Sequence, residues 1–340
     1  MGHETAGIAT GSQLTTVTRT LGPGLLLGIV GALIVVPAIP TDLQYGILIL
    51  GGVAVGLPHG ALDWAALPIA RRGRLAVGDV LLVGLLYAVL GGAALLTWLL
   101  WPIPAAIGFL LLTWFHWGQG DVHTVKIDYG ATYLRDRPNM SLTGLVRGGI
   151  PMVVPLIAFP ETYREVLKSF VQPFGASANF AVFSAPHLRL ALGGGLAIVT
   201  VLALVRSRLH SPNDPVWRLD CAETATLWLF FLTVPPVLAI AVYFACWHSW
   251  RHLVRLATLD RPTASALMLG DWRRPAARFV VGAFLPTVGA LGLLAGLWIM
   301  VPAPPTTAPD IVGLGLVAIA TLTVPHTAIV TWLDRLRAAG

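Results

Sequence analysis

The sequence predicts an all-α protein, a polytopic transmembrane helical bundle of about ten spans (8–10). Of its 340 residues, 56% are hydrophobic and only 11% are charged, whereas soluble domains usually carry about 25% charged residues. The mean hydropathy of +0.77 agrees with this. The apolar residues also come in long runs, each near the ~20 residues that a helix needs to cross a bilayer. A transmembrane barrel would show short alternating segments instead, so that class is excluded.

Ten apolar windows follow one another along the chain, and each is expected to form one span. Residues 219–259 fit a single long helix equally well, which would leave nine spans. With nine spans, the basic stretch 261–274 would lie outside the cell. A tight external turn at Pro235-Pro236 divides 219–259 into two spans, which gives ten and places the basic stretch inside. The positive-inside rule therefore favours ten spans with both termini cytoplasmic. The windows are 21–39, 43–67, 79–100, 103–121, 142–160, 187–205, 219–234, 237–259, 278–301 and 311–333.

The segments between the windows are too short for a soluble domain. We therefore expect one membrane-embedded domain over residues 19–340, behind a disordered cytoplasmic tail formed by residues 1–18. The tail is polar and lacks the basic region and cleavage site of a signal peptide. The segment 161–186 breaks the charge rule and is interpreted as an amphipathic helix in the interface.

The net charge of +6 comes from arginines in short loops. This distribution fits cytoplasmic loops better than a nucleic-acid surface, so no nucleic-acid partner is expected. The two cysteines, Cys221 and Cys246, lie in or beside apolar segments, which predicts reduced thiols and no disulfide.

Five of the nine histidines lie well inside predicted spans, away from their edges: His59, His116, His248, His252 and His326. Their four spans are all even-numbered and so run in one direction. At 1.5 Å per residue, the five lie roughly 0 to 6 Å to the cytoplasmic side of the span centres. His248 and His252, four residues apart, share one helical face. Ionisable residues are costly inside a membrane and usually functional, so five imidazoles at one depth predict a metal site.

Ligand chemistry alone leaves the metal open, because imidazole suits iron, copper, zinc and nickel. Haem is the main alternative, since two membrane helices often supply paired axial histidines. Two histidines one turn apart on the same helix can nevertheless bind a single ion more easily than they can bind two haems. The remaining histidines are interpreted as loop or interfacial residues: His3, His123, His187 and His210.

Carboxylates and aromatic residues surround the predicted layer. A metal-bound histidine usually donates its second N–H to an acceptor, and Asp63, Asp121 and Glu223 are the candidates for that role. Helix-end residues facing water are the competing interpretation for the two aspartates. Packing and an interfacial belt explain most aromatic residues of the chain. Six near the histidines are instead expected to line an apolar pocket at the metal: Trp64, Trp114, Phe115, Trp117, Trp247 and Trp250.

Several motifs together resemble the bacteriorhodopsin-related protein family (Brp and Brp-like, Blh), which are microbial membrane β-carotene dioxygenases. They are GLPHGALDW at 56–64, FHWGQGD at 115–121, RGGIP at 147–151, YFACWHSWRHLVRL at 243–256 and the late VPH at 324–326. The resemblance covers roughly residues 43–332. It implies a non-haem Fe(2+) cofactor bound by four histidines, with His326 in an accessory place. By motif the four ligands are His59, His116, His248 and His252.

The implied reaction is oxidative cleavage of the central double bond of β-carotene with O2, which gives two molecules of all-trans-retinal. The implied partners are β-carotene, O2, the lipid bilayer and a microbial rhodopsin that takes up retinal, and the implied location is the cell membrane. A metal or proton transporter is the non-enzyme alternative, but it predicts acidic residues along a whole path. A desaturase or hydroxylase shares the HxxxH spacing, but its adjacent histidine pairs of the HxxHH type are absent from the sequence.

Overall fold

The computed structural model describes the backbone of residues 2–36 and 38–339, and the side chains of residues 16–36, 38–267 and 269–336. Within these ranges every regular element is a helix, as the sequence predicts. The predicted disordered tail, residues 1–18, lies mostly outside the described side chains, although helix α1 is assigned from Gly2.

The helices of the first half are α1 (Gly2–Val35), α2 (Thr41–Gly51), η1 (Gly52–Gly56), α3 (Leu57–Gly60), α4 (Asp63–Arg72), α5 (Val77–Leu86), η2 (Tyr87–Gly91), α6 (Gly92–Leu100), α7 (Pro102–His123), η3 (Thr124–Asp128), η4 (Tyr133–Arg135) and α8 (Arg137–Ala158). Those of the second half are α9 (Pro160–Val171), η5 (Gln172–Phe174), η6 (Ala181–Ser184), α10 (Pro186–His210), α11 (Val216–Thr233), α12 (Pro236–Val242), η7 (Tyr243–Ser249), α13 (Trp250–Leu259), α14 (Arg261–Met268), α15 (Arg273–Met300) and α16 (Ala308–Ala339).

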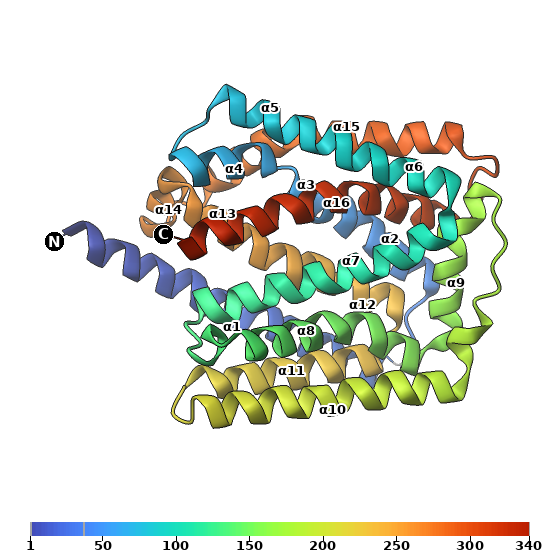
Figure 1. Ribbon diagram of the computed structural model, residues 1–340, viewed down its shortest axis with the longest axis horizontal. Coiled ribbons are helices and arrows are strands. Elements are labelled where there is room, and N and C mark those ends of the chain that lie inside the picture. The colour runs from blue at the N-terminus through green and yellow to red at the C-terminus, as the bar shows by residue number, and fades with distance from the viewer. Residues whose placement is uncertain (1, 37, 340) are drawn as a thin grey trace.

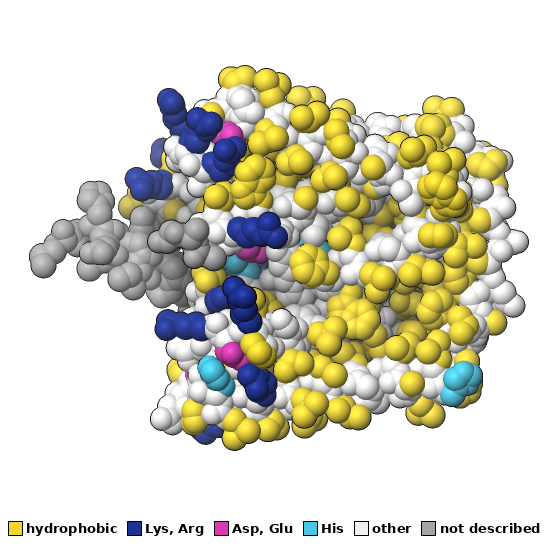
Figure 2. All heavy atoms as spheres, in the orientation of Figure 1, with side chains coloured by type: hydrophobic (Ala, Val, Ile, Leu, Met, Phe, Trp, Pro, Cys, Tyr) yellow, Lys and Arg dark blue, Asp and Glu magenta, His cyan; other side chains and the backbone are white. Residues whose placement is uncertain are grey.

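The long helices run side by side along the longest axis of the molecule, and α9 lies across one end of the bundle (Figure 1). Both termini lie at the opposite end. On the face shown in Figure 2, hydrophobic side chains cover most of the surface, while Lys and Arg gather at the end that carries the termini. An apolar flank with basic residues gathered at one end is the surface expected of a protein that lies in a bilayer.

Seven helices in the described part of the chain are long and apolar enough to cross a membrane. This criterion does not confirm the predicted number of about ten spans. The other three predicted spans are also helical, namely α7, α11 and the run from α12 to α13. They carry most of the buried ionisable residues near the histidines, which lowers their hydropathy. The seven are Thr16–Val35, Thr41–Arg72, Val77–Leu100, Arg137–Ala158, Pro186–His210, Arg273–Met300 and Ala308–Leu336.

Prolines and π-helical segments shape the helices that carry histidines. The predicted turn at Pro235-Pro236 is present: α11 ends at Thr233 and α12 starts at Pro236. The π-helical segment η1 ends three residues before His59, and η7 contains His248 itself. A π-helical turn shifts the side chains that follow it around the helix axis and is frequent at functional sites.

Glycines bring α7 and α8 into backbone contact. A Cβ atom on Gly118 would lie 2.1 Å from the carbonyl oxygen of Gly144, and one on Gly148 would lie 1.9 Å from that of Trp114. Membrane helices pack closely where small residues let their backbones approach. This contact fixes the position of α7, and therefore of His116, against the middle of the bundle.

Candidate metal centre

The five histidines of the predicted layer meet in the interior of the bundle. They come from five helical segments: α3 carries His59, α7 His116, η7 His248, α13 His252 and α16 His326. Each is buried, with at most 7% of its surface exposed. The structure thus brings together all five, including the one to which the resemblance gave only an accessory place.

The five imidazole rings form a closed circuit. Ring centres are 5.7 Å apart for His59 and His248, 5.0 Å for His248 and His116, and 4.9 Å for His116 and His326. They are 5.1 Å apart for His326 and His252, and 5.6 Å for His252 and His59. With metal–nitrogen bonds of about 2.1 Å, the centres of two imidazoles on one ion lie roughly 4.5–5.5 Å apart. Three of the five separations fall in this range and the other two exceed it by at most 0.2 Å, so the circuit is close to the dimensions of a single metal site.

The ring nitrogens are free to bind. The Nδ1 atom of His59 is hydrogen-bonded to the backbone carbonyl of Gly56, which leaves its Nε2 atom for a ligand bond. Among the described residues, neither ring nitrogen of His116 has a hydrogen-bond partner, and the Nε2 atoms of His248, His252 and His326 have none either. Buried polar atoms without a partner are rare, and a single metal ion would satisfy one nitrogen of each of these rings. The donor set therefore fits a metal.

Asp63 is paired with His326, whereas its spacing in the sequence indicates His59. The sequence places Asp63 four residues after His59, but α3 ends at Gly60 and a turn precedes α4, so the two do not share a continuous helix face. Instead Asp63 Oδ2 lies 2.8 Å from the Nδ1 atom of His326. The hydroxyl of Tyr87 donates to the same carboxylate oxygen at 2.8 Å.

A buried cluster of charges lies behind the histidines. Arg251 donates to Asp121 at 3.1 Å and to Glu223 at 2.7 Å, and Arg147 contacts Asp220 at 2.6 Å and Glu223 at 3.0 Å. All five side chains are at most 4% exposed. Asp121 and Glu223 are therefore bonded to arginines, and within the described residues neither makes a hydrogen bond to a histidine.

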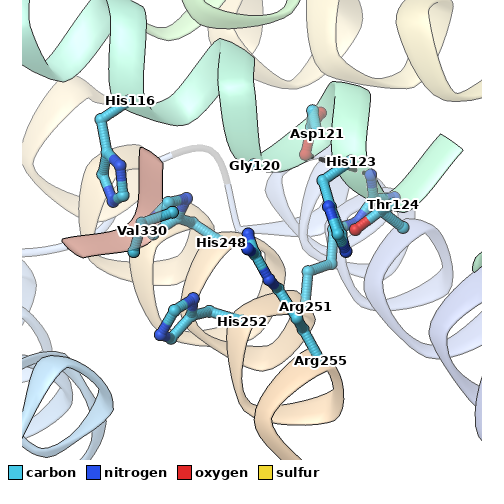
Figure 3. A pocket seen from close by; sticks show the side chains of 10 residues that line it. All are labelled: His116, Gly120, Asp121, His123, Thr124, His248, Arg251, His252, Arg255 and Val330. Carbon is cyan, nitrogen blue, oxygen red and sulfur yellow. Dashed lines mark hydrogen bonds and ion pairs between the residues drawn. The ribbon is translucent and has the colours of Figure 1, made fainter. Parts of the chain in front are cut away.

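This charge cluster fixes the helix that carries two of the histidines. Arg251 lies between His248 and His252 in the chain, and its guanidinium group stacks 4.0 Å from the ring centre of Trp247. The Trp247 indole in turn donates to Asp121 at 2.9 Å. Figure 3 shows His116 on α7 facing His248 and His252. These three side chains are part of the lining of a cavity of about 10 Å³. The cluster sets the rotation of this helix, so that His248 and His252 face the circuit.

An apolar cavity of about 650 Å³ reaches the histidines, and His59, His116, His248 and His326 form part of its wall. Its lining extends in two directions from them. One arm runs toward the end covered by α9, where it is lined by residues such as Tyr45 and Phe170; the other passes Trp64 toward α5. A largely apolar pocket with a few polar groups at one point is typical of a binding site for a hydrophobic ligand.

Two of the six predicted aromatic residues line this cavity, Trp64 and Trp117. The other four lie elsewhere in the described structure. Trp114 packs against α8 and donates to the carbonyl of Leu145, and Phe115 is 54% exposed on the outside. Trp247 belongs to the charge cluster, and Trp250 is absent from the cavity lining.

Sequence reasoning missed several residues of the wall. Phe244 stacks on His248, with ring centres 6.1 Å apart, and meets His59 edge-on. Its place four residues before His248 is a helical signal that would have found it. Tyr87 carries no such signal, because it reaches Asp63 from another helix.

Comparison with known proteins gives a consistent result. Residues 50–334 match the family model described as beta-carotene 15,15'-dioxygenase. The chain is 47% identical over 330 residues to "Probable beta-carotene 15,15'-dioxygenase Blh" of Halobacterium salinarum, covering 94% of both chains. It is 30% identical over 323 residues to "Probable beta-carotene 15,15'-dioxygenase Brp" of the same organism, covering 88% of this chain and 86% of that one. No solved structure matches it.

Proposed function

Because the chain belongs to the beta-carotene 15,15'-dioxygenase family, we propose that it cleaves the central double bond of β-carotene with O2. The products are two molecules of all-trans-retinal. One oxygen atom enters each aldehyde, so the reaction needs no external reductant.

One observation carries this proposal: the large apolar cavity opens onto the histidine circuit partway along its length. His59 follows Tyr45, in one arm, by fourteen residues, or about 21 Å along a helix. The second arm continues past the histidines along Trp64 and Val80. A long hydrocarbon that fills both arms has an internal bond at the histidines, whereas a pocket ending at the metal would present a chain end.

The metal of this proposal is iron(II), with His59, His116, His248 and His252 as ligands. The buried nitrogens of His116, His248 and His252, which have no partner among the described residues, support a bound ion, and the choice of iron rests on the resemblance. Bound iron would supply the activation of O2. The protein residues bind and orient the polyene, and the apolar lining keeps water away from the site.

The substrate explains the placement in a membrane. A carotenoid partitions into lipid, and the cavity is lined by residues of several apolar helices that face the bilayer. We propose a multi-pass protein of the cell membrane with both termini cytoplasmic and with a microbial rhodopsin as the receiver of retinal. A reporter fused after Asp260 is expected to be cytoplasmic.

Expression in a β-carotene-producing host tests the activity. Loss of the orange colour and appearance of retinal in the extracts are expected, and the His248→Ala variant, expressed to the same level, is expected to leave β-carotene intact. If the protein is present in the membrane fraction and no retinal is formed, the proposed function is wrong.

A further inference from the structure

The Asp63–His326 pair lies beside the four proposed ligands and has no role in the proposal so far. From its geometry we propose that His326 is a fifth ligand of the metal, held in its binding tautomer by Asp63. This inference rests on the proposed function, because it concerns the same ion.

The first argument is the direction of the hydrogen bond. An ionised carboxylate only accepts hydrogen bonds, and Asp63 Oδ2 already accepts one from the Tyr87 hydroxyl at 2.8 Å. At 2.8 Å from the same oxygen, the Nδ1 atom of His326 is the donor and carries the hydrogen. The Nε2 atom then has a free lone pair. It is buried, and within the described part of the chain it has no partner. Histidines that bind metals are commonly oriented by a carboxylate in this way.

The second argument is the place of the ring in the circuit. The centre of the His326 ring lies 5.1 Å from that of His59, 4.9 Å from that of His116 and 5.1 Å from that of His252. An ion among the other histidines therefore lies within reach of this ring as well. Moreover, Asp63, His252 and His326 each have one possible ligand atom, and these three atoms lie within 4.8 Å of one another.

The third argument is that the ring contacts among the other four histidines form an open row. Their neighbouring pairs run from His116 through His248 and His59 to His252, and this row has two ends. The ring of His326 stands next to both ends and closes the circuit. This is the position that a further ligand of the same ion would occupy.

Cobalt(II) offers a readout that does not depend on catalysis. The purified full-length protein is loaded with Co(II) in place of iron, and its visible absorption is recorded during titration, because the intensity and position of these bands report coordination number and geometry. We expect His326→Ala to bind Co(II) at least tenfold more weakly and to show altered bands, and added imidazole to restore the parent spectrum.

A matched control separates this effect from the loss of any buried histidine. His123 is also buried on α7, 7% exposed, but its Nδ1 atom lies 3.0 Å from Asp334 and it stands outside the circuit. His123→Ala is expected to keep the parent Co(II) affinity and spectrum. If His326→Ala also keeps both, His326 is not a ligand and the inference is overturned.

A second variant covers the case in which His326→Ala does not accumulate. His326→Gln retains a polar side chain of similar length that can still reach Asp63, but it offers no imidazole. Altered cobalt bands in this variant support the inference, and unaltered bands overturn it. The proposed function fails in a different way, with a parent protein that binds no metal or releases no retinal.

Discussion

Arg251 donates a hydrogen bond of 2.7 Å to Glu223, and both side chains are at most 4% exposed. The pair joins α11 to the helix that carries His248 and His252. Arg147 lies 3.0 Å from the second oxygen of the same carboxylate, so that one glutamate holds two buried guanidinium groups. The position of Glu223 therefore influences the orientation of His248 and His252, although Glu223 touches none of the histidines.

Replacement of Glu223 by alanine is expected to destabilise the protein strongly. It leaves the charges of Arg147 and Arg251 buried with fewer partners, and breaking a buried pair in this way typically costs about 3–5 kcal/mol. Thermal unfolding of the purified protein and its level in membranes measure the loss. Glu161→Ala is the control, because Glu161 pairs with Arg164 at the surface and is itself 63% exposed. An equal loss of stability in both variants would show that the buried cluster contributes no more to stability than a surface ion pair.

The contact between α7 and α8 predicts a large effect of a single methyl group. Gly148→Ala puts a Cβ atom 1.9 Å from the carbonyl oxygen of Trp114, which forces the two helices apart and moves His116 out of the circuit. Metal content and cleavage are both expected to fall at least tenfold. Gly194→Ala serves as the control, since a Cβ atom there meets nothing within 4 Å. Normal metal content in Gly148→Ala would refute the link between this contact and the site.

The histidine layer could be predicted from the sequence, because it depends on depth alone. Spacing along each helix and the direction of each span give the depth of a residue, and all five rings do meet. The rotation of a helix about its axis does not follow from depth. Trp247 and His248 are sequence neighbours, yet successive helical residues point about 100° apart, so that one joins the charge cluster and the other the circuit. The partnership of Asp63 with His326 joins residues 263 positions apart and depends on how α4 packs against α16.

The cavity arm that runs toward α9 predicts a variant that blocks the substrate and spares the metal. Gly315 lines this cavity, and a Cβ atom there meets nothing within 4 Å, so Gly315→Leu places its side chain in open space. We expect a fall of at least tenfold in kcat/KM for β-carotene with unchanged iron content. Gly292→Leu is the matched control on α15, because it also meets nothing within 4 Å but lies outside the lining. Unchanged kcat/KM in Gly315→Leu would show that this arm does not hold the substrate.

Metal exchange distinguishes a redox role of the ion from a merely structural one. Removal of the metal with a chelator is expected to abolish cleavage, because no ion is then held by the histidines to activate O2. Iron(II) should restore activity. Zinc also binds imidazole, but it has no redox chemistry, so a zinc-loaded protein should be stable and inactive. Retinal release and metal content are measured on the same samples, with untreated protein as the reference. Full activity with zinc would show that O2 is not activated at this ion, and it would leave the histidine circuit as a structural site beside the reaction.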